Sequence, residues 1–284
     1  MSVSIVFEDN HLVVVNKPTG LATMGTALDE PSLARDVQAY LKHKYNKPGN
    51  VYLGVVSRLD TVTSGLVVFA KTSKAAARLT AQFRERTVDK WYLAAVPTVS
   101  AEVLERCPAL PAANWCESAQ VCWEDWVWKD DAAHRMRVRR VAISGKRRGN
   151  SGGSGESGEE GQLAKLAWRL LGRGPDFDLV LVRLMTGRKH QIRVQFADRG
   201  FPMLGDRKYG SRTPFWSGIA LHSWRLELLH PITKIKQTFF QDPPNAWSNL
   251  ESIEVERDVP CDPKAVISRP AALLRFLASQ LRAD

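Results

Sequence analysis

Short runs of apolar and β-branched residues recur along the chain, and most have the length of a strand. Residues 4–7 and 12–15 flank the polar segment EDNH and predict a β-hairpin. Between residues 32 and 44 the apolar residues recur at helical spacing. A second helix is predicted after Ser73, which we expect to be its N-cap because serine is a preferred capping residue.

Other segments have the composition of strands or of single helices. Further strands are predicted at 51–56, 66–70, 91–96, 163–171, 179–185, 220–228 and 236–240, and further helices at 189–199 and from Pro270. In residues 134–141 the alternation places Arg135, Arg137 and Arg139 on one face of a strand. Strands outnumber helices without a regular βαβ alternation. We therefore expect an α+β fold with a mixed, mainly antiparallel sheet.

One segment lacks any apolar residue that could anchor it. Residues 144–162 read SGKRRGNSGGSGESGEEGQ, a composition typical of a flexible surface loop. No internal repeat is visible on either side of it. We expect residues 1–284 to form a single domain that contains this loop.

Charge and cysteine content narrow the class of protein. Forty Lys and Arg against thirty Asp and Glu give a net charge of +10, which favours a polyanionic partner such as nucleic acid but also fits a merely basic protein. The four cysteines show no metal-ligand spacing, so we expect free thiols and no zinc site. No apolar run reaches the roughly 20 residues that span a bilayer. We expect a soluble intracellular protein without membrane contact, in a compartment that the sequence does not define.

The segment VVSRLDTVTSGLVVFAKT, residues 55–72, contains a single acid between two apolar runs. A nearby guanidinium favours the ionised carboxylate, so Arg58 is expected to keep Asp60 charged. Such a carboxylate can serve as a nucleophile, a general base or an electrostatic stabiliser. From spacing alone, a structural Arg–Asp pair that braces a turn is the commoner explanation.

A second candidate is TGRKHQIRVQF, residues 186–196, which concentrates four basic residues where a loop enters a helix. These are Arg188, Lys189, His190 and Arg193. The start of a helix suits a phosphate or carboxylate, and Lys189 and Arg193 would share one helix face. A solvated basic face is the alternative, and the pattern alone does not decide between the two.

Five blocks in the same order resemble a known family. VSRLDTVTSGLVVFAKT resembles the catalytic signature of RluA-type pseudouridine synthases. The other blocks that match this family are NKPTGL (16–21), KWY (90–92), TGRKHQIRVQFADRGFPMLGDRKYG (186–210) and ALHSWRLELLHPIT (220–233). The similarity runs from about residue 5 to residue 240, and it is weakest over 98–163. It is specific, because five ordered blocks agree.

The resemblance implies an RNA-modifying isomerase that converts uridine, in ribosomal or transfer RNA, to pseudouridine without a cofactor or metal. It implies two half-domains around a central catalytic cleft and a structured RNA whose uridine is flipped out. Because the first matching block lies close to the start of the chain, we expect no separate N-terminal RNA-binding domain, and we expect a monomer. By the family match Asp60 is the essential acid, as a nucleophile or a base. Tyr92 would stack on the uracil and could accept the C5 proton, and Arg193 would pair with Asp60.

The same match implies residues that contact the substrate. These are Arg58, Ile192, Lys17, Arg188 and His190. Arg58 would occupy the place that the target nucleotide leaves or contact its backbone, and Ile192 would pack against the base or Tyr92.

The chain departs from the family pattern at Ser57, where a histidine is usual. Serine has no ring to stack on a base, so the departure concerns RNA deformation and substrate choice more than the chemistry at Asp60. Two alternatives remain open: a catalytically inactive RNA-binding protein of the same fold, and an N-glycosidic hydrolase that releases the free base.

Overall fold

The computed structural model describes residues 3–25, 30–100, 120–141 and 161–244, together with 109–110, 247, 253–255 and 266–267. Its strands form one sheet and are β1 (Ser4–Glu8), β2 (Leu12–Lys17), β3 (Gly54–Val55), β4 (Ser64–Ala70), β5 (Asp89–Val96), β6 (Ala109–Leu110), β7 (Gln120–Asp130), β8 (Arg135–Arg140), β9 (Gln162–Arg173), β10 (Asp178–Leu184), β11 (Leu221–Leu229), β12 (Lys236–Phe240), β13 (Ile253–Val255) and β14 (Val266–Ile267). The helices are α1 (Leu33–Lys44), α2 (Ser73–Glu85), α4 (Gln191–Asp198) and the short 3₁₀ helix η1 (Arg207–Tyr209). The expected α+β class with a mainly antiparallel sheet is confirmed.

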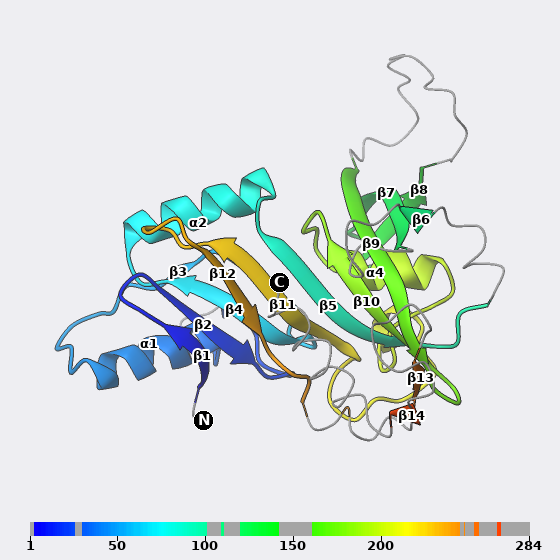
Figure 1. Ribbon diagram of the computed structural model, residues 1–284, viewed down its shortest axis with the longest axis horizontal. Coiled ribbons are helices and arrows are strands. Elements are labelled where there is room, and N and C mark those ends of the chain that lie inside the picture. The colour runs from blue at the N-terminus through cyan, green and yellow to red at the C-terminus, as the bar shows by residue number, and fades with distance from the viewer. Residues whose placement is uncertain are drawn as a thin grey trace, which may run out of the picture.

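The first half of the fold is built on β1, β2 and β4, with a helix on each face of the sheet (Figure 1). The predicted hairpin of β1 and β2 is confirmed, and β2 pairs antiparallel with β4. Because side chains alternate along a strand, Val14 and Val68 pack with α2, whereas Val15 and Val67 pack with α1. Both central strands are therefore buried on both faces, which explains their nearly continuous apolar sequence.

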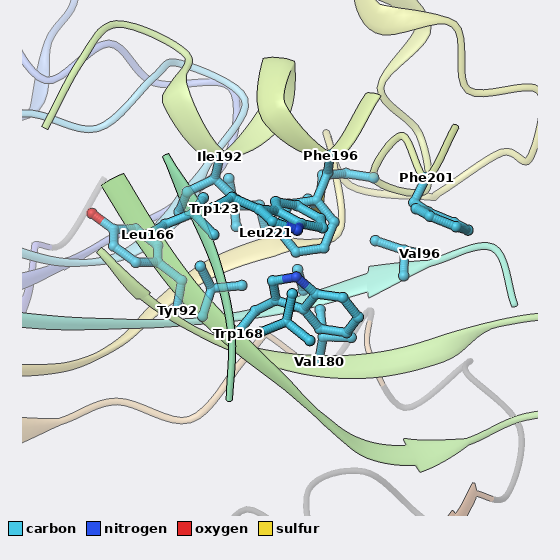
Figure 2. Packing of buried hydrophobic residues seen from close by; sticks show 14 of the residues in the cluster. Tyr92, Val96, Trp123, Leu166, Trp168, Val180, Ile192, Phe196, Phe201 and Leu221 are labelled. Carbon is cyan, nitrogen blue, oxygen red and sulfur yellow. The ribbon is translucent and has the colours of Figure 1, made fainter. Parts of the chain in front are cut away.

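The second half continues the sheet through β5, β10, β9 and β7, each antiparallel to the next, with β8 at the outer side of β7 (Figure 1). Its core is aromatic: Trp123, Trp168 and Phe196 lie with ring centroids 4.6–5.6 Å apart. Figure 2 shows Tyr92 at one edge of this cluster, with its hydroxyl directed away from Trp168 and Phe196. The cluster thus fixes the ring of Tyr92 and leaves its polar end outside the apolar packing.

The two halves meet where β4 and β11 run parallel. Only His222–Ser64 and Ser223–Gly65 are paired there, after which β4 diverges and β12 takes its place beside β11. Gly65 has a φ of +112°, and a Cβ at this position would lie 2.3 Å from the backbone oxygen of Ser223. Only glycine permits this crossing. Both strands contribute side chains to one pocket beside this crossing, Leu66 from β4 and Ser223 from β11.

The crossing also contains a buried histidine. His222 is fully buried, with Nδ1 2.8 Å from Ser64 Oγ and Nε2 2.9 Å from the carbonyl oxygen of Gln241. A neutral ring satisfies both contacts when Nε2–H donates to Gln241 and Ser64 donates to Nδ1. Burial lowers the pKa of His222 to about 4, from an ordinary value of 6.5. The folded protein therefore excludes the proton that the unfolded chain binds below pH 6.5.

This gives a pH-dependent stability with a defined sign. Between pH 6.5 and 4 the unfolded state binds one proton more, so the free energy of unfolding falls as the pH falls, by roughly 3 kcal/mol in total from this group. Urea unfolding at pH 7.5 and 4.5 measures the difference. In His222→Gln, which keeps an amide donor and acceptor, the difference should shrink by this amount. An unchanged difference would contradict the assignment.

Several predicted boundaries shift. The strand expected at 51–56 is reduced to β3, residues Gly54–Val55. The N-cap of α2 is Thr72, one residue earlier than expected, and its Oγ1 accepts from the N–H of Ala75 at 3.2 Å. Helix α4 begins at Gln191, so Lys189 precedes it and does not share a helix face with Arg193. Gly200, with φ +89°, lies two residues after the end of α4.

Other predictions are settled only in part. The alternation of β8 is confirmed, since Arg135, Arg137 and Arg139 are exposed and Met136 is buried. Cys122 is free, and the other three cysteines lie outside the described residues. The helix expected from Pro270 and nearly all of the loop at 144–162 also lie outside them. In the described part of the chain, no helix is long and apolar enough to cross a membrane.

Candidate active site

A pocket of about 500 Å³ opens between the two halves of the fold, beside the crossing of β4 and β11. Its wall is drawn from the loop before β4, the end of α2, strands β5, β10 and β11, and the start of α4. Among the residues that line it, Asp60 is the single carboxylate. The cations are Arg58, Arg84, Arg86, Lys90, Arg188 and Arg193. The pocket is therefore strongly positive around one acid.

The Asp60 loop is held by backbone contacts with the segment that follows β2. The N–H of Gly20 donates to the carbonyl of Thr61 at 2.8 Å, and Thr23 Oγ1 bonds both backbone groups of Leu59 at 2.9 and 3.1 Å. Within the loop, the N–H of Thr63 donates to the carbonyl of Asp60 at 3.0 Å. The acid is thus presented from a turn whose backbone is bonded on both sides of it.

Lys17 also holds the Asp60 loop in place, and it does not line the pocket. It is fully buried, and its Nζ donates to the carbonyls of Pro18, Leu21 and Thr61 at 2.7–3.1 Å. Burial lowers the pKa of Lys17 to about 8, although the charge of Asp60 opposes the shift. The structure therefore places Lys17 beneath the Asp60 loop, away from any surface that RNA could reach.

Arg193 binds two carboxylates at once. Its Nη1 lies 2.9 Å from Asp60 Oδ2, while Nε and Nη2 hold Asp206 in a bidentate pair at 2.7 and 2.9 Å. Although burial acts against it, these two acids raise the pKa of Arg193, so the guanidinium stays charged. Asp206 is almost fully buried and Asp60 is partly exposed. Asp206 therefore fixes the guanidinium of Arg193, and this guanidinium orients the carboxylate of Asp60. The match to the family implied the pair of Arg193 and Asp60.

His190 lies on the other side of Asp60. Its Nε2 is 3.8 Å from Asp60 Oδ1, and its Nδ1 is 2.9 Å from the hydroxyl of Tyr209. The Tyr209 oxygen accepts from the N–H of Met136, so its proton can donate to Nδ1 and leave Nε2–H facing Asp60. Burial lowers the pKa of His190 despite Asp60, which keeps the ring neutral at pH 7. His190 adopts φ +52°, a strained backbone for histidine.

Tyr92 and Ile192 form the apolar wall of the pocket. Both are almost fully buried, belong to the aromatic cluster and line the pocket. Burial raises the pKa of Tyr92 to about 12, although its hydrogen bond with Ser223 opposes the shift. The phenol is therefore protonated in the resting state.

The remaining predicted residues lie at the edge of the pocket. Arg58 is exposed and forms no ion pair with Asp60 in the described structure, so the adjacency seen in the sequence is not the pair that holds the acid. Arg188 is half-buried, and its Nε donates to the carbonyl of Leu163 at 3.1 Å. Ser57 Oγ accepts from the N–H of Val68 at 3.1 Å and donates to its carbonyl at 3.2 Å.

Two residues that matter for the geometry were not predicted. Asp206 fixes Arg193, and Tyr209 orients His190. Both belong to the Gly-Asp-x-x-Tyr-Gly sequence that ends the third matching block, which was the available signal. No group of three His, Cys, Asp or Glu side chains among the described residues could hold a metal ion.

The model of the RNA pseudouridylate synthase family matches residues 11–198, which include the Asp60 loop, Tyr92 and Arg193. The chain belongs to this family. It is therefore an RNA pseudouridine synthase, and such enzymes are isomerases. The expected family, with its RNA partner, is confirmed.

Individual relatives agree with this assignment. This synthase is 31% identical to "RNA pseudouridine synthase 1" of Oryza sativa subsp. japonica over 278 residues, covering 87% of this chain and 74% of the relative. It is 31% identical to "Dual-specificity RNA pseudouridine synthase RluA" of Haemophilus influenzae, covering 83% and 90% of the two chains. Three other curated relatives are longer, and the chain spans 58% to 65% of their length.

The fold is shared with solved structures. The structure entitled "Human RNA Pseudouridylate Synthase Domain Containing 1" superposes with a TM-score of 0.61, at 21% identity, over 98% of this synthase and 95% of the human chain.

Proposed function

We propose that this synthase isomerises a uridine that is extruded from structured RNA into the pocket, with Asp60 as its essential acid. The observation that carries the proposal is the position of Asp60: a lone carboxylate in a cationic pocket, oriented by an arginine that Asp206 fixes in turn. Lys17, Asp206 and Tyr209 are positioning residues in this proposal, because they act through the Asp60 loop, Arg193 and His190.

The reaction needs one carboxylate. Because it is an isomerisation, the substrate and the product contain the same atoms, and no water is consumed. The bond from C1′ to N1 breaks, the uracil turns, and C5 bonds to C1′; C5 loses a proton and N1 gains one. Asp60 acts at the sugar, either by bonding to it or by removing a proton from it. Hydrolytic glycosidases place a second carboxylate across the scissile bond. The pocket has no second one among its lining residues, which favours isomerisation over hydrolysis.

The uridine must leave its stack to reach Asp60, because the acid lies inside a pocket. Extrusion costs a few kcal/mol and least for an unpaired base, so loops and bulges are the preferred targets. Ser57 lies on the pocket wall, but its hydroxyl is bonded to both backbone groups of Val68. We propose that this enzyme deforms RNA through the cations that line the pocket, including Arg58. An aromatic ring at position 57 would then not be needed.

Tyr92 is proposed to stack on the uracil and to accept the C5 proton. With the pKa of the phenol near 12, the ionised fraction rises tenfold per pH unit up to that value. The rate of product formation should therefore rise between pH 6 and 9. In Tyr92→Phe, which keeps the ring, it should fall by about 10²–10⁴-fold and lose this rise, with RNA affinity unchanged. If this variant turned over as fast as wild type, Tyr92 would not be the proton acceptor and would only pack against the base.

The RNA class is proposed from a relative's name and from the family resemblance. One relative is named for the ribosomal large subunit, which supports ribosomal RNA as the substrate, and transfer RNA is the second class that the resemblance implies. We also propose that the catalytic unit is a single domain that acts as a monomer. Mapping pseudouridine across total RNA from cells with and without this chain tests the substrate.

Incubation of the purified protein with those RNAs tests the reaction itself. Pseudouridine retained in the chain is the expected product. Released uracil would instead indicate a hydrolase, and binding without any product would indicate an inactive RNA-binding protein.

A further inference from the structure

Three cations that line the pocket have no acidic partner among the described residues. Arg86 ends α2, Lys90 lies on β5, and Arg188 precedes α4; all three line the pocket. Within the described part of the chain, none of them forms an ion pair. Arg84, by contrast, is paired with Glu85 at 3.6 Å.

The three side chains lie near one another. A Cβ built on Gly187 would be 3.8 Å from Lys90 Nζ, so the ammonium lies beside the backbone that leads into Arg188. Burial lowers the pKa of Lys90, with Asp89 opposing the shift and Arg86 adding to it; burial and Arg86 likewise lower the pKa of Arg188. Arg86 is therefore close enough to both to repel them.

Asp89, the acid whose charge acts on Lys90, does not neutralise this group. The carboxylate of Asp89 accepts from Trp91 Nε1 at 2.7 Å, Arg183 Nε at 2.9 Å and Arg225 Nη1 at 3.2 Å. Asp89 and Lys90 are adjacent on a strand, so their side chains project from opposite faces of the sheet. The positive charge of the three cations is thus left for an external anion.

The location indicates which anion. Lys90 and Tyr92 are two residues apart on β5, so they project from the same face with backbones roughly 7 Å apart. One nucleotide can contact both side chains, with its base against Tyr92 and its backbone beside Lys90. The Nε of Arg188 is already bonded to Leu163, which fixes the guanidinium and leaves its two terminal nitrogens for an oxyanion.

We propose that Arg86, Lys90 and Arg188 form an anion subsite that holds one backbone phosphate adjacent to the extruded uridine. The subsite rests on the proposed function, because it takes its ligand from the RNA strand that carries the target. Its contribution is independent of sequence, since a phosphate contact positions the strand without reading bases. It therefore fixes where the nucleotide enters relative to Asp60.

The test measures binding without turnover. In an Asp60→Asn background, the affinity for a stem–loop RNA with uridines in its loop is measured over a range of salt concentrations. The triple variant of Arg86→Gln, Lys90→Gln and Arg188→Gln should reduce the slope of log K against log [salt] by about 0.7–0.9, the value for one phosphate, and each single variant should reduce it by part of that amount. Lys90→Arg should keep the slope. Lys47→Gln, on an exposed lysine outside the pocket, is the matched control and should leave it unchanged.

Two further measurements exclude a structural effect. Arg86→Gln and Lys90→Gln each remove one of three mutually repelling cations and should leave the urea midpoint equal or higher, so a lower midpoint with reduced binding in these two variants would overturn the proposal. Arg188→Gln also loses the bond to the carbonyl of Leu163, so its midpoint is expected to fall. RNAs with one uncharged methylphosphonate 5′ or 3′ of the target uridine complete a double-mutant cycle. At one of these positions the Lys90→Gln effect should disappear; persistence of the effect at both would overturn the subsite.

The outcomes separate the subsite from the proposed function. If wild type forms pseudouridine on this RNA while all three variants bind with the wild-type slope, the subsite is wrong and the function stands. If the slopes fall as expected but wild type forms no pseudouridine in any RNA, the subsite stands and the proposed function is wrong.

Discussion

Asp60→Asn is expected to lower pseudouridine formation by roughly 10⁴-fold or more while the protein stays folded and binds RNA. Asparagine has nearly the same shape but can neither bond to C1′ nor remove a proton from the sugar. The fold should persist because Arg193 keeps its bidentate pair with Asp206. RNA affinity should be equal or higher, since the single negative charge of a cationic pocket is lost. Single-turnover product assays and direct binding measurements give the two numbers.

Asp206→Asn is the matched control, because it makes the same change on the opposite side of the same arginine. Asp206 does not line the pocket. This variant should lose about 10²-fold in turnover through misplacement of Arg193. It should also lose about 3 kcal/mol of stability, because a buried pair is broken. Equal activity of Asp60→Asn and wild type would contradict the assignment of Asp60, whatever Asp206→Asn does.

Gly65→Ala is expected to destabilise the protein by more than about 4 kcal/mol, although it adds a single methyl group. That methyl would lie 2.3 Å from the backbone oxygen of Ser223, in a φ region that L residues rarely adopt. Neither strand can move away without breaking the pairing of β4 with β2 or of β11 with β5. Urea unfolding measures the loss, and the same variant should lose activity because the pocket begins at this crossing.

Gly200→Ala separates the cost of the close contact with Ser223 from the cost of the positive φ. Gly200 also has a positive φ, +89°, but a Cβ there has nothing within 4 Å. Its cost should be about 1–2 kcal/mol, from backbone conformation alone. Similar losses in the two variants would show that the approach of Ser223 contributes little at Gly65.

Much of the fold follows from local patterns. The hairpin of β1 and β2, helix α1 and the strands β9 and β10 were predicted because their apolar spacing matches their burial. The strand expected to run to Val56 fails for a reason that spacing does not show. Ser57 Oγ occupies both backbone groups of Val68, so β4 has no free partner there and β3 ends at Val55.

The start of α4 was missed for a similar reason. His190 has a positive φ, which excludes it from the helix, and its ring is bonded to Tyr209, a residue 19 positions away. Gln191 accepts from Thr186 Oγ1 and from the N–H of Arg188, which shapes the turn before the helix. These contacts join distant positions, so the helical pattern of residues 189–199 could not reveal them.

The site shows the same limit. Sequence adjacency suggested Arg58 as the partner of Asp60, yet the bonded partner is Arg193, 133 positions away. The agreement of separate blocks with the family implied this pair, and local spacing did not. The positioning role of Lys17 could not be predicted either. It depends on three carbonyl oxygens, of Pro18, Leu21 and Thr61, that come together only in the folded chain.

We expect the short parallel contact of β4 with β11 to act as a hinge between the two halves of the fold. Each half of the fold keeps its own hydrogen-bonded ladder, whereas only two residue pairs join these strands at the crossing. A small rotation about Gly65 would widen or narrow the pocket without breaking either ladder. Such a rotation would also act on the 2.9 Å bond between Asp60, on the loop before β4, and Arg193, on α4. We therefore expect RNA to change amide exchange first at residues 64–66 and 221–223, ahead of the surrounding strands.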